Sequence, residues 1–380
     1  MTRLHDLWDQ QRQSLWLDDI SRDMLNTGAL KRQIQEDGIR GVTSNPSIFE
    51  KAIAAGDAYN DQIADLIRAG KSSGEIFEAV EVDDIRNACD LFADLYRESD
   101  GSDGYVSIEV APEFARDTEG TIGEARRLWS SVDRPNLMVK IPGTAEGIPA
   151  IKQALVEGIS VNVTLLFSVE RYEQVALAHL EALEARHAGG ESIRTLASVA
   201  SFFVSRVDTL VDKLLDERIS DATDPEIVTL ATSLKGKIAV ANAKMAYQKF
   251  LEIFESDRFE PLRAARGNVQ RPLWASTGTK NPAYSDVLYV ESLIGPNTVN
   301  TMPGKTIEAF ADHGVVARTV DTGVEEARQA IADLERVGVD LQAATAQLEE
   351  EGIATFAKSF DSLISGVEGK RADIAETVAS

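Results

Sequence analysis

The sequence has 380 residues, which is long enough to bury a full hydrophobic core, and its apolar and charged fractions, 43% and 27%, are those of an ordinary globular protein. It carries 39 basic and 62 acidic side chains, and this formal net charge of -23 disfavours binding to nucleic acid or to an anionic membrane. An anionic substrate would therefore need a local group of basic side chains.

Several further features bear on location and cofactors. No run of about 18 apolar residues predicts a membrane span, and the polar stretch 1–13 does not resemble a signal peptide. Cys89 is the only cysteine, which fits a reducing compartment, so we expect a cytoplasmic protein. The four histidines lack metal-ligand spacing, and no glycine motif for nucleotides is present, so we expect neither metal nor cofactor.

Eight short apolar runs recur along the chain, most of them rich in β-branched residues. They are Ser14–Leu17, Ile39–Thr43, Tyr105–Val110, Leu137–Ile141, Val161–Phe167, Leu196–Phe203, Leu273–Ser276 and Thr298–Thr301. Because these runs are apolar on both faces, they suit parallel strands with helices on one side and a barrel core on the other.

Helix-like segments separate the runs. Amphipathic patterns predict helices over Thr121–Ser131, Glu170–Arg186 and Ser205–Glu217, and a long helix over Ile227–Glu255 begins after a cap at Asp224 and Pro225. The alternation predicts one α/β domain over 1–380, a (β/α)₈ TIM-type barrel with added helices around 205–265 and 320–380. A doubly wound open sheet is the competing fold.

Polar side chains occur in or just after each run, where a barrel of this type carries its active site. Lys140 is the most informative of them, because it interrupts the apolar strand Leu137–Ile141. Burial disfavours the charged ammonium, so we expect a fraction of neutral amine, which attack on a ketone requires. A lysine that merely reaches solvent or pairs with a carboxylate is the alternative.

Five motifs in order resemble the transaldolase family over nearly the whole chain. They are Gly41–Phe49, Val106–Val110 with Asp117–Glu119, Asn136–Gly147, Asn162–Phe167 and Ser201–Arg206. The start Trp16–Asp19 and the chain length resemble the longer bacterial and plant-type branch of this class of Schiff-base aldolases.

The resemblance implies a role for each matched residue. Lys140 would form the Schiff base, Asp18 would be the general acid and base of carbon–carbon cleavage, and Glu109 and Thr164 would hold a water that relays protons. The substrate would contact Asn45, Asn162, Ser201 and Phe203, and its phosphate would be bound by Arg206 with Ser276 beside it.

Two positions stay open. A second basic residue follows the seventh strand in the family; Lys280 is the candidate here and Arg271 its rival. Asp18 and Asp19 are adjacent, so only one of them can face the site, and the resemblance favours Asp18.

The implied reaction transfers a dihydroxyacetone unit from sedoheptulose 7-phosphate to glyceraldehyde 3-phosphate, giving erythrose 4-phosphate and fructose 6-phosphate in the pentose phosphate pathway. The partners would be sugar phosphates, and the protein would be a monomer or a homodimer. The alternatives are a fructose 6-phosphate aldolase, a metal-dependent aldolase and a non-catalytic sugar-phosphate-binding barrel. In proteins that resemble fructose 6-phosphate aldolases, the positions that match Glu109 and Phe203 carry glutamine and tyrosine. The glutamate and phenylalanine found here therefore favour group transfer.

Overall fold

The computed structural model describes residues 2–379, and its centre is a closed barrel of eight parallel strands. Each strand pairs with the next in the chain, and β8 pairs with β1. The strands are β1 (Gln13–Leu17), β2 (Gly41–Val42), β3 (Tyr105–Glu109), β4 (Leu137–Pro142), β5 (Val161–Leu166), β6 (Ser198–Phe203), β7 (Gln270–Ala275) and β8 (Thr298–Met302). The predicted barrel is confirmed, and the open-sheet alternative is wrong.

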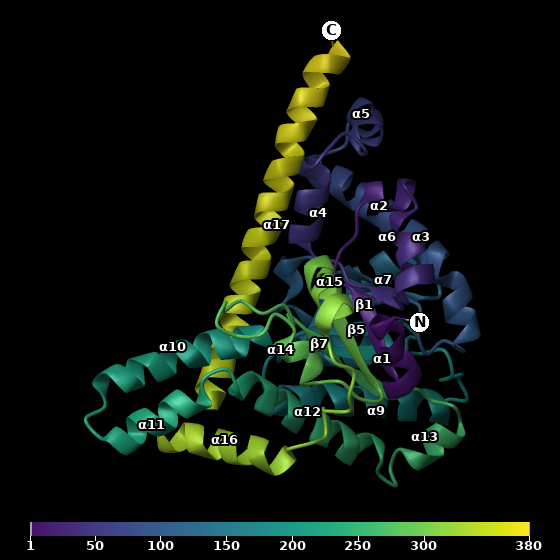
Figure 1. Cartoon of the computed structure of the whole chain (residues 1–380). Coiled ribbons are helices and arrows are strands. Elements are labelled where there is room, and N and C mark those ends of the chain that lie inside the picture. The colour runs from purple at the N-terminus through teal and green to yellow at the C-terminus, as the bar shows by residue number, and fades with distance from the viewer. Residues whose placement is uncertain (1, 380) are drawn as a thin grey trace.

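Helices surround the barrel, and the last of them stands out from it (Figure 1). Up to β4 they are α1 (Arg3–Gln11), α2 (Arg22–Asn26), α3 (Ala29–Arg32), the π-helix Gln33–Asp37, α4 (Pro46–Ala54), α5 (Asn60–Arg68), α6 (Ser73–Glu98), the 3₁₀ turn Pro112–Phe114 and α7 (Thr118–Val132). After β4 they are α8 (Gly147–Val156), α9 (Val169–Ala188), α10 (Ser205–Asp221), α11 (Pro225–Leu234), α12 (Ile238–Phe254), α13 (Glu260–Ala264), α14 (Leu288–Glu291), α15 (Gly304–His313), α16 (Val324–Arg336) and α17 (Leu341–Ala379). No helix within residues 2–379 combines the length and apolarity that a membrane crossing requires.

The strands are buried on both faces, and the two faces pack into different clusters. In β4, Val139 and Ile141 belong to the large cluster that joins the barrel to its helices, whereas Met138 belongs to a second, smaller cluster. The second cluster comprises Trp16, Tyr105, Met138, Ala197, Val199, Leu273, Ala275 and Val299, all from strands or the residue just before one. Because successive strand residues point to opposite sides, this second cluster fills the barrel interior.

The amino end of the barrel holds a buried carboxylate. Asp103 is fully buried and accepts hydrogen bonds from Trp16 Nε1 at 3.0 Å and Arg40 Nε at 2.6 Å. Arg271 enters the same network, donating to Ser14 Oγ at 2.7 Å. Buried charges require such partners, so these contacts fix the floor of the barrel.

The predicted single helix over Ile227–Glu255 is wrong, because α11 ends at Leu234 and α12 starts at Ile238. Gly236 lies between them with φ +69°, a left-handed conformation that suits glycine. Its N–H donates to Asp212 Oδ1 at 2.9 Å, and a Cβ on Gly236 would lie 2.7 Å from the Tyr284 ring. The predicted start is confirmed: Asp224 accepts a hydrogen bond from Glu226 N, and Pro225 opens α11.

A second buried carboxylate ties α10 to its neighbours. Asp208 Oδ1 accepts from Ala239 N in α12 at 2.7 Å, and Oδ2 accepts from Tyr289 OH in α14 at 3.0 Å. Burial raises the pKa of Asp208 to about 7, and the nearby Asp212 carboxylate adds to the increase, while the hydrogen bond from Ala239 N opposes it.

The break at Gly236 yields a prediction about stability. Gly236→Ala should lower the free energy of unfolding by about 2 kcal/mol or more, since it adds a clash to a left-handed residue. Gly190→Ala is the matched control, because Gly190 also has a positive φ but open space around it, and it should cost only about 1 kcal/mol. Urea denaturation of both variants gives the comparison, and equal losses would contradict the proposed clash with Tyr284.

Asp208 yields a prediction about pH. Between the ordinary carboxyl pKa of 3.8 and about 7, the folded protein keeps a proton that the unfolded chain has released, so stability falls as the pH rises through this window. Asp208→Asn lacks this loss, its Oδ1 can still accept from Ala239 N, and its NH₂ group can donate to the Tyr289 hydroxyl oxygen. Its melting temperature should exceed that of the parent by about a few degrees above pH 7, with the difference shrinking toward pH 4. A difference independent of pH would contradict the assignment.

Candidate active site

A cavity of about 290 Å³ opens at the carboxyl ends of the strands. The predicted site residues that line it are Asp18, Asn45, Glu109, Lys140, Thr164, Ser201, Phe203, Arg206, Ser276 and Lys280. They come from all strands except β8, or from the segments that follow them, and β8 adds Thr301. Asn162 is the predicted residue that does not line the cavity.

Lys140 reaches this cavity from inside the barrel. It is two positions after Met138, so it shares the interior face of β4, and only 7% of it is exposed. Its Nζ donates to Glu109 Oε2 at 3.1 Å and to the Ser44 backbone oxygen at 3.1 Å. Glu109 lies directly opposite Lys140 in the β3–β4 register, which explains their contact.

Two carboxyl groups accompany this amine. Burial raises the pKa of Glu109 and of Asp18, and in both cases the charge of Lys140 opposes the increase. Thr43 Oγ1 donates to Asp18 Oδ1 at 2.8 Å and so orients the carboxyl group. Asp19 is exposed and does not line the cavity, as alternation along the strand requires.

Asn162 is fully buried beside the cavity lining. Its Nδ2 donates to Ser107 Oγ at 3.0 Å, and its Oδ1 accepts from Ser201 Oγ at 2.7 Å. The carboxamide is therefore engaged on both sides, and in this structure it holds Ser201, which does line the cavity. A direct contact between Asn162 and a substrate stays a prediction.

The segments after β2 and within β5 have irregular local structure. Asn45 caps α4 by accepting a hydrogen bond from Ile48 N at 3.1 Å, which leaves its side-chain NH₂ group as a donor. In β5 the register shifts between Val163 and Leu166, and Leu165 has φ +60°. Such bulges redirect side chains, and here Thr164 and Leu165 both line the cavity.

Two basic side chains lie at the cavity without a carboxylate partner. Arg206, at the start of α10, stacks over the Phe203 ring at 4.9 Å, and Lys280 is exposed at the rim. Neither forms an ion pair with any residue in 2–379. Burial lowers the pKa of Arg206, and the carboxylates of Asp18 and Glu109 oppose this shift. These cations provide the local basic group that an anionic substrate requires.

The structure places Lys280 and Arg271 at opposite ends of the barrel. Lys280 lines the cavity, whereas Arg271 points into the barrel floor and bonds to Ser14 and Asp103. Ser276 has a left-handed backbone conformation, with φ +56°. Its hydroxyl group lies 2.9 Å from the hydroxyl group of Ser205. This contact links the segment after β7 to the start of α10.

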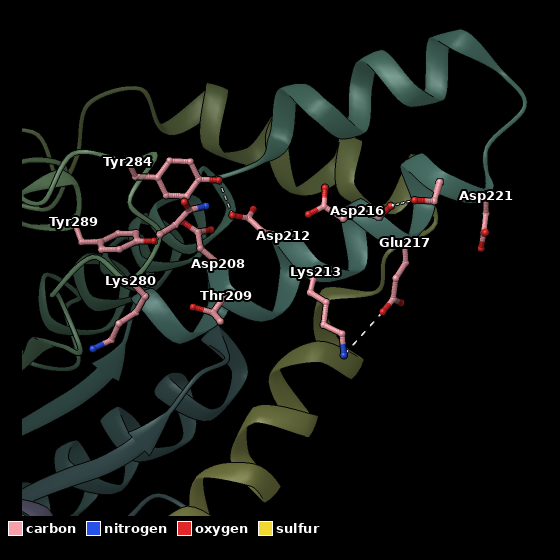
Figure 2. Close-up of a pocket in the computed structure, with 12 residues that line it drawn as sticks. Asp208, Thr209, Asp212, Lys213, Asp216, Glu217, Asp221, Lys280, Tyr284 and Tyr289 are labelled. Carbon is pink, nitrogen blue, oxygen red and sulfur yellow. Dashed lines mark hydrogen bonds and ion pairs between the residues drawn. The ribbon is translucent and has the colours of Figure 1, made fainter.

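A larger cavity of about 770 Å³ lies beside the first, along α10 (Figure 2). Lys280 lines both cavities. Tyr284 OH donates to Asp212 Oδ2 at 2.6 Å, and with the Tyr289–Asp208 bond this fastens the segment after β7 to α10. The acidic side chains of this second cavity suit it poorly to a phosphate, and the Lys140 amine lies outside it.

Several lining residues were not predicted. Thr43 and the Ser44 carbonyl hold Asp18 and Lys140, although both belong to the quoted motif around β2. Gly352, Thr355, Phe356 and Ser359 come from α17, more than 200 residues after Lys140. Their spacing of three, one and three residues places them on one face of the helix, which is the only signal in the sequence.

The arrangement provides a buried amine, two carboxyl groups with raised pKa and unpaired cations in one cavity. An amine of this kind can add to a ketone, and carboxyl groups with raised pKa can exchange protons with the adduct. Residues 2–379 contain no group of three or more histidine, cysteine or acidic side chains that could bind a metal ion.

Comparison with known proteins agrees with this geometry. The family described as Transaldolase/Fructose-6-phosphate aldolase matches residues 15–367. A transaldolase of Trichodesmium erythraeum is 51% identical over 94% of this chain and 95% of its own length. Transaldolase 2 of Nostoc sp. is 49% identical over 94% of this chain and 95% of its own length. A transaldolase of Mycolicibacterium smegmatis is 50% identical over 94% of both chains. The resemblance predicted from the motifs is confirmed, and the chain belongs to the transaldolase/fructose-6-phosphate aldolase family.

Proposed function

We propose that the protein is a transaldolase that transfers a dihydroxyacetone unit from sedoheptulose 7-phosphate to glyceraldehyde 3-phosphate, releasing erythrose 4-phosphate and fructose 6-phosphate. The observation that carries this proposal is the Lys140 amine, buried in the barrel 3.1 Å from the Glu109 carboxyl group and sharing a cavity with Asp18. Relatives at about 50% identity with the same name support it.

In the first step, the neutral Lys140 amine attacks the ketose carbonyl carbon. The carbinolamine that forms must lose its hydroxyl as water, and this requires a proton donor. Glu109 is positioned for this task by its contact with Lys140, and burial raises the pKa of its carboxyl group. Thr164 lines the same cavity and would help to hold the water that carries the proton.

In the second step, the bond between the α carbon and the β carbon of the protonated imine breaks. The Asp18 carboxylate takes the proton of the hydroxyl on the leaving aldose, and the bonding electrons move into the imine to give an enamine. The same proton returns to the new hydroxyl when the enamine attacks the acceptor aldehyde. The hydrogen bond from Thr43 keeps Asp18 in one orientation through both transfers.

The substrate phosphate would lie at the other side of the cavity, between Arg206, Ser276 and Lys280. Arg206 offers a planar pair of donors, and it lies in the first turn of α10, where the helix dipole also favours an anion. Lys280 would contribute a point charge at the rim. Asn45 and Ser201 remain for the hydroxyls of the dihydroxyacetone moiety.

A fructose 6-phosphate aldolase is the alternative within this family. Glu109 and Phe203 favour the transaldolase assignment by the resemblance given above. The measurement is turnover of fructose 6-phosphate with and without an aldehyde phosphate acceptor. Strong dependence on the acceptor supports transfer, and equal turnover without it would overturn the proposal in favour of the aldolase.

We further propose a cytoplasmic protein whose partners are sugar phosphates rather than nucleic acids or membranes, acting as a monomer or a homodimer. The net charge of -23 supports the exclusion of polyanions, and the single buried Cys89 supports a reducing compartment.

The Schiff base yields the first prediction for this site. Lys140→Ala should lower kcat by at least about 10⁴-fold, because it removes the nitrogen atom that forms the covalent bond to the substrate. Borohydride reduction of the parent in the presence of fructose 6-phosphate should leave a three-carbon adduct on Lys140, seen by mass spectrometry. An intact parent enzyme without an adduct would support a non-catalytic sugar-phosphate-binding barrel instead.

The second prediction separates two adjacent carboxylates. Asp18→Asn should still form the trapped imine but lower kcat by about 10²–10⁴-fold, since the base for carbon–carbon cleavage is lost. Asp19→Asn is the control and should keep near-normal kcat, because Asp19 is exposed outside the cavity. The reverse pattern would show that the wrong carboxylate has been assigned.

A further inference from the structure

The carboxyl-terminal helix α17 forms one wall of the cavity that contains Lys140. Figure 1 shows this helix running past the barrel beside α4 toward α5, and it also contacts α6 and α10. Gly352 and Phe356 are the buried members of its cavity-facing stripe, and Thr355 and Ser359 lie nearer the solvent. The wall is therefore apolar inside and polar at the mouth.

The helix approaches the barrel closely at Gly352. A Cβ on Gly352 would lie 3.2 Å from Leu165 Cδ2 and 3.4 Å from the Phe167 ring, so a larger residue would push the helix outward. Phe167 in turn packs against Phe203, with ring centroids 5.2 Å apart, and Arg206 lies over Phe203. The wall is thus in contact with residues on the phosphate side of the cavity.

Contacts on both sides of this stripe hold α17 in place. Before it, Glu349 pairs with Arg171 at 3.3 Å, and Glu350 pairs with Arg116. After it, the Phe360 and Phe77 rings meet edge to face at 5.9 Å, and Lys370 Nζ donates to the Ile53 oxygen in α4 at 2.7 Å. Contacts on both sides of the stripe therefore orient Phe356 toward the cavity.

Phe356 has an unusual position for a buried aromatic residue. Only 8% of it is exposed, yet it belongs to neither of the two hydrophobic clusters of the molecule. Its ring lines the cavity that contains Lys140. The cavity volume of about 290 Å³ is the space that remains with this ring in place, so a smaller side chain at position 356 would enlarge the cavity and admit more water.

Exclusion of water matters for the enamine on Lys140, which has two possible fates. It can attack an acceptor aldehyde, so that a carbon–carbon bond forms and Asp18 returns its proton to the new hydroxyl. Alternatively, its nucleophilic carbon takes a proton that originates in solvent, water adds to the resulting imine carbon, and the carbon–nitrogen bond breaks. The second route releases free dihydroxyacetone and restores the amine, with water as the co-reactant.

We propose that Phe356 of α17 is a specificity-determining residue that limits the entry of water to the Lys140 enamine and so favours transfer to an aldehyde over release of dihydroxyacetone. This inference rests on the proposed transaldolase function and deepens it. It assigns the choice between the two activities named for the family to the terminal helix as well as to the strand residues.

The test compares two phenylalanines on the same helix. In Phe356→Ala, free dihydroxyacetone released from fructose 6-phosphate, relative to transfer to erythrose 4-phosphate, should rise about tenfold or more, the scale of a single pocket contact. Phe360→Ala is the matched control: it removes the same ring from α17, but Phe360 packs on Phe77 and does not line the cavity. Its release-to-transfer ratio should stay at the parent value. Phe356→Leu, which refills most of the space, should give an intermediate ratio.

Trapping with borohydride separates failure of this inference from failure of the proposed function. If the parent forms no Lys140 adduct, the transaldolase proposal itself is wrong. If the parent and Phe356→Ala form the adduct in similar yield but share one release-to-transfer ratio, only the role of Phe356 is wrong. Should Phe356→Ala fail to fold, Phe356→Leu decides the matter, because an unchanged ratio in that folded variant also overturns the inference.

Discussion

The ion pair between Lys140 and Glu109 is the interaction on which the rest of the site depends. Their side chains are only 9% and 7% exposed, and the two charged atoms are 3.1 Å apart. Taking an ammonium and a carboxylate out of water costs several kcal/mol for each, so the barrel can hold either of them only because the other is present. The same burial raises the pKa of Glu109, and Lys140 limits the increase. The pair therefore keeps an amine away from bulk water and places beside it a carboxyl group that can exchange protons.

The barrel brings these groups together through strand alternation and register. The two-residue period places Lys140 above Met138 on the interior face of β4, and it separates Asp18 from Asp19 at the end of β1. The β3–β4 register then sets Glu109 opposite Lys140. The Lys140–Glu109 contact requires no particular loop conformation, because both residues lie in strands that are buried on both faces.

The sequence contained enough information for the barrel, since each strand is a local apolar run, and for Lys140, since a lysine in such a run is unusual. The predictions failed or stayed open where distant segments decide the conformation. The apolar period continues on both sides of Gly236, but the helix breaks there because Tyr284 and Asp212, from other elements, fit around a left-handed glycine. Arg271 and Lys280 flank the same strand, and only its direction in space shows which of them reaches the cavity. The sequence of α17 shows a helical stripe, but only the position of the helix beside the barrel shows that this stripe faces the cavity.

The cations of the cavity show how the site differs from the rest of an acidic protein. Other buried or partly buried arginines form ion pairs with carboxylates, as Arg22 does with Asp84 and Arg40 does with Asp103. Arg206 is half-buried and lies without such a partner within residues 2–379, and the loss of water lowers its pKa. An unpaired, partly desolvated guanidinium destabilises the free protein, and a bound phosphate relieves that cost by supplying the missing anion. If Arg206 binds the substrate phosphate as proposed, the free energy withheld from folding there is available for binding, and a molecule with a net charge of -23 can still attract a phosphorylated substrate.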